Sequence, residues 1–117
     1  MVAHQHSDSV IDMAQIQSIC GNDTDRIKKY FSYVIAETSE LLNEIETAIN
    51  NNNSQLSRDL FHSLKGSAGM SGILQIPDLC IQAEEKSLQS DWDAVHKIYA
   101  AIEIIFKKLQ VEVEENF

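Results

Sequence analysis

Hydrophobic residues recur every three or four positions along most of the chain, which is the spacing that builds one face of an α-helix. The longest such stripe follows Asp23 and is broken at Thr38; its members are Ile27, Tyr30, Phe31, Val34, Ile35, Leu41, Leu42, Ile45, Ala48 and Ile49. Four asparagines occupy positions 50–53, and asparagine favours turns over helix interiors. We therefore expect one long helix that begins near Asn22 or Asp23 and ends at the asparagines.

Four other segments show the same helical period. The first begins at Ser9, whose hydroxyl can cap a helix, and a glycine follows its last apolar residues. A further helix is expected over about 54–72. Pro77 suits the first turn of the next helix, because a missing N–H costs nothing there. The last helix is expected to begin at Asp91 or Asp93.

No run of alternating apolar and polar residues with turn chemistry argues for strands. Short loops between long amphipathic helices favour antiparallel neighbours. The expected fold class is therefore all-α, an antiparallel up-down four-helix bundle with an additional short N-terminal helix. We expect one domain over residues 9–117, preceded by a mobile polar tail over residues 1–8.

The chain is strongly acidic, with 18 Asp and Glu against 9 Lys and Arg and a formal net charge of −9. A nucleic-acid binder needs a basic face to neutralise phosphates, and an anionic membrane surface makes a similar demand, so neither partner is expected. No apolar run approaches the ~20 residues that span a bilayer, and the start of the chain lacks the apolar core of a signal peptide. We expect a cytoplasmic monomer.

Two cysteines, Cys20 and Cys80, lie inside apolar stretches without CxxC-type spacing. A disulfide framework in so short a chain normally uses more cysteines, so both are expected to be reduced core residues. His4 and His6 form a His-x-His sequence that could bind a metal, but histidines in a polar terminus are expected to be incidental.

The third expected helix carries the chemistry. At about 100° per residue, His62, Lys65, Gly66 and Gly69 fall within about 60° of one line along its axis. The apolar residues lie on the opposite side and must face the core; they are Leu60, Phe61, Leu64 and Ala68. The stripe that contains His62 should therefore face solvent.

Glycine is an unusual choice on a solvent-facing helix stripe. Each glycine in a helix interior costs about 1 kcal/mol relative to alanine. The absence of side chains at Gly66 and Gly69 would let the backbone of another protein approach the imidazole of His62 closely. Neutral imidazole is a nucleophile near physiological pH, and the ammonium group of Lys65 could neutralise a phosphoryl group placed on it.

The string His62-x-x-Lys65-Gly66-Ser67-Ala68, followed by Gly72, resembles the signature of histidine phosphotransfer (HPt) domains. Further positions fit that family's pattern, and the resemblance covers about residues 9–112; these positions are Ile76, Leu79, Cys80 and Glu84. The chain departs from the pattern at three positions without losing a reacting group: Phe61, Ile73 and Ala83.

The resemblance implies that His62 accepts a phosphoryl group from a receiver-domain aspartyl phosphate and passes it to the aspartate of another receiver. Lys65 would stabilise that group, while Gly66, Gly69 and Met70 would contact the docked partner. The expected partners are the receiver domains of hybrid sensor kinases and response regulators. Mg²⁺ would be held by the receiver, so this chain needs no cofactor and no metal. It would be a phosphocarrier and not an ATP-dependent kinase, since it lacks a nucleotide-binding loop.

Two alternatives belong to other classes. One is a helical adaptor that binds receiver-like partners without being phosphorylated. The other is a metal-binding bundle, because Asp59-x-x-His62 and Asp93-x-x-His96 repeat the ligand spacing of di-iron bundles, and more acids are available at Glu37, Glu40 and Glu44. Such ligands must point into the core, whereas His62 is expected to point away from it.

Overall fold

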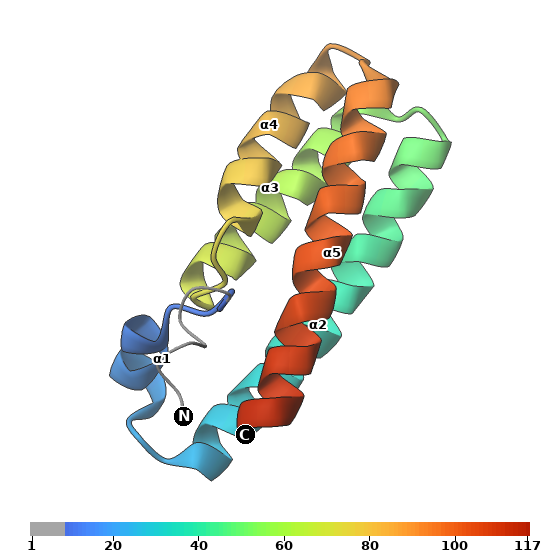
Figure 1. Ribbon diagram of the computed structural model, residues 1–117. Coiled ribbons are helices and arrows are strands. Elements are labelled where there is room, and N and C mark those ends of the chain that lie inside the picture. Colours follow the sequence, from blue (N-terminus) through green and yellow to red (C-terminus); the bar gives the residue numbers. More distant parts are fainter. Residues whose placement is uncertain (1–8) are drawn as a thin grey trace.

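The computed structural model describes residues 9–117, which fold into five α-helices (Figure 1). They are α1 (Met13–Cys20), α2 (Thr24–Asn50), α3 (Ser54–Met70), α4 (Ile76–Leu88) and α5 (Trp92–Asn116). Within residues 9–117 the only β-type pairing is one isolated bridge between Ile11 and Ile73. The expected tail, with His4 and His6, lies outside the described residues.

Side-chain caps set most of the helix starts where the sequence predicts them. Asp23, Asn53 and Asp91 each accept a hydrogen bond from a backbone N–H in the first turn of α2, α3 and α5. Pro77 lies in the first turn of α4. The expected bounds of the long helix and the expected starts of the last two helices are confirmed, while α3 ends at Met70, short of the expected Gly72.

The expected start of the first helix at Ser9 is wrong, because α1 begins at Met13 with Asp12 as its cap. Residues 9–12 instead form an extended strap. Its backbone exchanges hydrogen bonds with the α3–α4 loop, from the Asp12 N–H to the Gly72 carbonyl and from the Leu74 N–H to the Val10 carbonyl. Those tertiary bonds and the hydrogen bonds that Ser9 and Val10 donate to Glu112 on α5 outweigh the local helical period.

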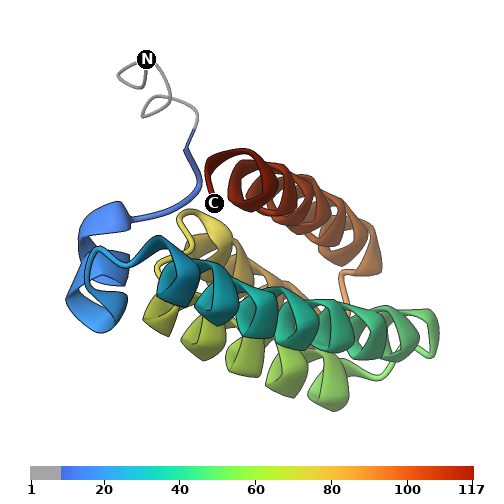
Figure 2. The same cartoon turned by 90° about the horizontal axis from the view of Figure 1, so that it is seen from below.

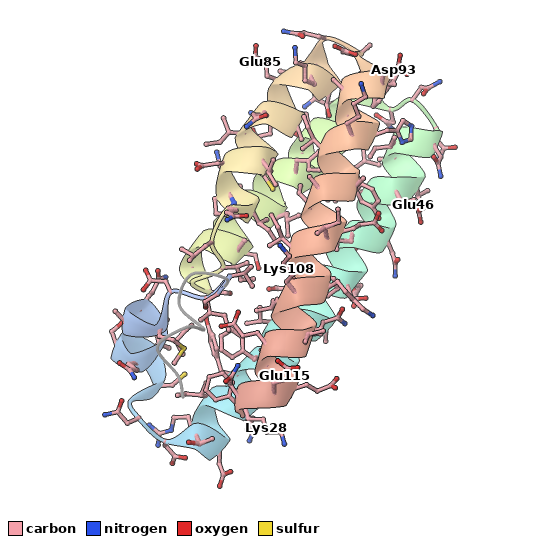
Figure 3. All side chains as sticks on the ribbon, in the orientation of Figure 1. Lys28, Glu46, Glu85, Asp93, Lys108 and Glu115 are labelled. Atoms are coloured by element: carbon pink, nitrogen blue, oxygen red, sulfur yellow. The ribbon has the colours of Figure 1, made fainter. Side chains whose placement is uncertain are left out.

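The four long helices form a closed ring in which each packs against its neighbours in sequence and α5 returns to α2. Figure 3 labels Lys28 near the start of α2 and Glu115 near the end of α5 at one end of the bundle, and Glu85 and Asp93 at the other. Figure 2 shows α1 beside the ends of the long helices. The expected four-helix bundle with an added N-terminal helix is confirmed.

The core is filled from all five helices, and its largest fully buried side chains include Phe31, Phe61, Ile45 and Ile102. Both cysteines are free and buried in it, as expected. Tyr99 is also buried in the core, and its hydroxyl donates a hydrogen bond to the Leu42 carbonyl at 3.0 Å. Within residues 9–117 no helix combines the length and the apolar character needed to cross a membrane.

Candidate functional site

The predicted orientation of α3 is confirmed. Phe61, Leu64 and Ala68 are fully buried against the other helices. The side chain of His62 faces outward and is 56% exposed. Burial of one side of α3 thus holds the imidazole at the surface of a rigid bundle.

Beside His62, the exposed surface of α3 carries no side chain at Gly66 and Gly69. A Cβ atom on Gly66 would meet no other atom within 4 Å, so nothing in this chain requires a glycine there. A Cβ on Gly69 would only touch the Pro77 ring, at 4.0 Å. Met70 projects into solvent and is 75% exposed. The two glycines therefore leave open space beside the imidazole instead of admitting a neighbouring helix.

Glu84 of α4 joins the two predicted reactive side chains. Its Oε1 atom lies 3.2 Å from Nδ1 of His62, and its Oε2 atom lies 3.4 Å from Nζ of Lys65. A carboxylate can only accept a hydrogen bond, so Nδ1 of the neutral ring carries the proton and Nε2 keeps its lone pair. Glu84 thereby orients the ring and leaves Nε2 as the ring atom with a free lone pair.

The Glu84 carboxylate is the most enclosed charge of the site, with a side chain only 14% exposed. Its Oε2 atom is buried and accepts no hydrogen bond from the described residues, so the Lys65 ammonium compensates its charge as an ion pair. Arg58 approaches the other oxygen, with Nε at 3.7 Å from Oε1. Two cations thus stabilise the carboxylate that holds His62.

Sequence reasoning recognised Glu84 only as a position that fits the HPt pattern and gave it no role. It missed Arg58 altogether. Both lie on helix faces that the pattern marks as polar, and the spacing of 22 residues between His62 and Glu84 crosses a loop. Local periodicity predicts which face of α4 is polar, but it does not predict the register of α4 against α3.

Contacts from three helices hold α3 in position. The Gln15 side-chain amide of α1 donates to the Gly69 and Met70 carbonyls, at 2.9 and 3.0 Å, at the C-terminal end of α3, where carbonyls lose their partners within the helix. Ser57 of α3 bonds Ser87 of α4 inside the core, at 2.8 Å. The remaining contact comes from α2, where Glu37 accepts a hydrogen bond from Ser67 at 2.7 Å.

Cys80 lies below this site on α4 but is not poised to react. Burial raises the pKa of its thiol to about 12, and the Glu84 carboxylate adds to that rise. The thiol is therefore neutral at physiological pH, and a neutral thiol is a poor nucleophile.

The metal-binding alternative requires ligands that converge in the bundle. His62 lies at the surface, and the Asp59 carboxylate bonds Gln55 and Arg58 instead. His96 is exposed on α5. In the part of the chain that the structure describes, no three His, Cys, Asp or Glu side chains gather closely enough to hold a metal ion.

Comparisons with known proteins agree with this architecture. The family model for the Hpt domain matches residues 29–114, which include His62, Lys65 and Glu84. No curated relative matches the sequence. The crystal structure of histidine-containing phosphotransfer protein B (HptB) from Pseudomonas aeruginosa PAO1 matches with a TM-score of 0.81 at 17% identity, over 91% of this chain and 92% of that chain. That likeness shows the fold, and the family match shows that this chain belongs to the Hpt domain family.

Proposed function

We propose that this chain is a phosphorelay intermediate that accepts a phosphoryl group on His62 from the aspartyl phosphate of one receiver domain and passes it to the aspartate of another. The observation that carries the proposal is the outward imidazole of His62, oriented by Glu84 at 3.2 Å and bordered by open space over Gly66.

The transfer is written with this chain's own atoms. The lone pair of Nε2 forms the N–P bond as the bond between phosphorus and the aspartyl oxygen breaks, and the electron pair leaves with the carboxylate. The proton on Nδ1 stays with the ring, held by Glu84. In the second transfer the N–P bond breaks, and the electron pair returns to Nε2 as the next aspartate forms its bond to phosphorus.

The other predicted residues have supporting roles. The Lys65 ammonium, now paired with Glu84, is close enough to His62 along α3 to share its charge with a phosphoryl group on the ring. Gly66, Gly69 and Met70 contact the docked receiver. Mg²⁺ is assigned to the receiver, and none to this chain. The protein acts as a cytoplasmic, monomeric carrier without ATP-dependent kinase activity.

The test uses a panel of purified receiver domains, each phosphorylated with acetyl phosphate. We expect at least one to transfer a single phosphate to the wild-type chain, detected by intact mass. The label should be acid-labile and alkali-stable, as expected of a phosphohistidine. His62→Gln should fold normally and take no label. Label retained in His62→Gln, or no transfer from any receiver or from the small donor phosphoramidate, would refute the proposal and favour an unphosphorylated adaptor.

A further inference from the structure

A groove runs along the surface between α2 and α3, with a volume of about 540 Å³. Its lining includes Tyr33, Glu37, Glu40 and Glu44 on α2 and Ser63 and Ser67 on α3. The two helices lie side by side along this surface (Figure 2). The groove is thus walled on one side by the helix that carries His62.

The groove lies next to the phosphorylation site, because Ser63, which lines it, directly follows His62 in the sequence. On the surface of α3, Gly66 lies about 40° from His62 in the direction of the groove, and Ser67 lies about 140° away. Because Gly66 has no side chain and open space above it, no side chain at this position separates the imidazole from the groove. A protein seated over His62 would therefore meet no side chain at position 66 on its way to the groove.

The groove is acidic along its length and has an exposed aromatic ring near one end. Among residues 9–117, no salt bridge involves Glu37, Glu40 or Glu44, whereas Glu84 nearby pairs with three basic residues. Like charges three and four positions apart on a helix repel each other and destabilise it. Tyr33 is 71% exposed, although tyrosine is a residue type that interfaces commonly bury.

Glu37 accepts a hydrogen bond from Ser67, but no hydrogen bond or salt bridge among residues 9–117 offsets the repulsion at Glu40 and Glu44. Leu41 and Leu42 pack against the core from neighbouring positions of α2. Uncharged residues in place of the groove glutamates would therefore be compatible with this helix. A partner with basic side chains would relieve the repulsion and cover the tyrosine ring together with Met70, which is also strongly exposed.

We propose that the α2–α3 groove is the specificity surface of the phosphotransfer site and selects receiver domains that present basic side chains beside an apolar contact. The inference rests on the proposed function and adds the chemistry of the partner. The receiver sits over His62 with its apolar contact on Tyr33 and Met70. Its Lys or Arg side chains extend along the groove to Glu40 and Glu44.

The experiment reverses two groove charges in Glu40→Lys/Glu44→Lys, which spares the hydrogen bond between Glu37 and Ser67. The matched control is Glu46→Lys/Glu114→Lys, which changes the net charge equally. Glu46 is exposed about 180° around α2 from Glu37 and is labelled in Figure 3. Circular dichroism and thermal unfolding establish that both variants are folded.

The readout is the initial transfer rate from the receiver that labels the wild-type chain fastest, at low and at high salt. We expect the groove variant to be about tenfold slower than the control at low salt, because steering by complementary charge raises association rates by about this factor or more. The difference should shrink at high salt as the charges are screened. Tyr33→Ser should also slow transfer at both salt concentrations.

Equal rates for the groove variant and its control would overturn the inference. So would a larger loss from Ile81→Ser, on the α4 side of His62, than from Tyr33→Ser. Wild-type labelling separates these results from a failure of the proposed function, because a chain that no receiver and no phosphoramidate can label is not a phosphocarrier at all.

Discussion

Replacing Glu84 with Gln removes the carboxylate that holds Nδ1 of His62 at 3.2 Å while nearly preserving the shape of the side chain. A hydrogen bond to a charged group contributes about 1.5–3 kcal/mol when it is shielded from water. The His62 side chain is 56% exposed, so screening reduces the contribution here to about 1 kcal/mol. Loss of that preference for the Nδ1–H tautomer corresponds to a transfer rate about fivefold lower.

The assay combines the initial rate of transfer from a phosphorylated receiver with nitrogen NMR of the His62 ring, which reports the tautomer directly. Glu85→Gln is the matched control, because Glu85 is exposed on the same helix and contacts Gln89 instead of His62. A purely structural role for Glu84 would change thermal stability without changing the tautomer. A wild-type rate and an unchanged tautomer population in Glu84→Gln would refute the assignment of Glu84 as the positioning residue.

Four further predictions concern Lys65, Gly66, Gly72 and Cys80. Lys65→Ala should shorten the lifetime of the phosphorylated chain by about fivefold, because a cation worth about 1 kcal/mol is lost; a mass-resolved decay experiment measures this, and an unchanged lifetime contradicts it. Gly66→Leu should raise the free energy of unfolding by about 0.7 kcal/mol but block transfer, as unfolding and transfer assays on the same sample would show. Gly72→Ala should lower the free energy of unfolding by about 2 kcal/mol, since Gly72 has φ of +70° and an added Cβ would lie 3.2 Å from the Ile16 side chain. Cys80 should resist alkylation at pH 8 until the protein unfolds, because burial raises its pKa to about 12; rapid alkylation of the folded chain would contradict this.

The helices could be predicted because their determinants are local. The side chain of Asp23 caps α2 from the adjacent position, and Pro77 fits the first turn of α4 without help from the rest of the fold. The start of α1 could not be predicted in the same way. Ser9 is a suitable cap by type, but the strap of residues 9–12 is held by the α3–α4 loop and by α5, which lie far away in the sequence.

In the site, too, locally determined features could be predicted and features set by packing between helices could not. The outward direction of His62 follows from the burial of Phe61 and Leu64 on the same helix, so periodicity was sufficient. The position of Glu84 depends on how far α4 slides along α3, which is set by packing across the whole bundle. The groove depends likewise on the placement of α2 beside α3. Periodicity along one helix therefore could not predict which residues of a second helix contact the site.

The open face of α3 is possible because the rest of the molecule compensates for it. Gly66 and Gly69 each weaken the helix by about 1 kcal/mol relative to alanine. Gln15, Ser87 and Glu37 bond α3 from three other helices, at its end, in the core and beside the groove. The proposed transfer requires the imidazole to meet phosphorus in line, and a loose helix would lose that alignment. Tertiary contacts within the bundle thus restore the rigidity that the two glycines remove. A helix face without side chains at these positions can therefore still hold the imidazole in a fixed position.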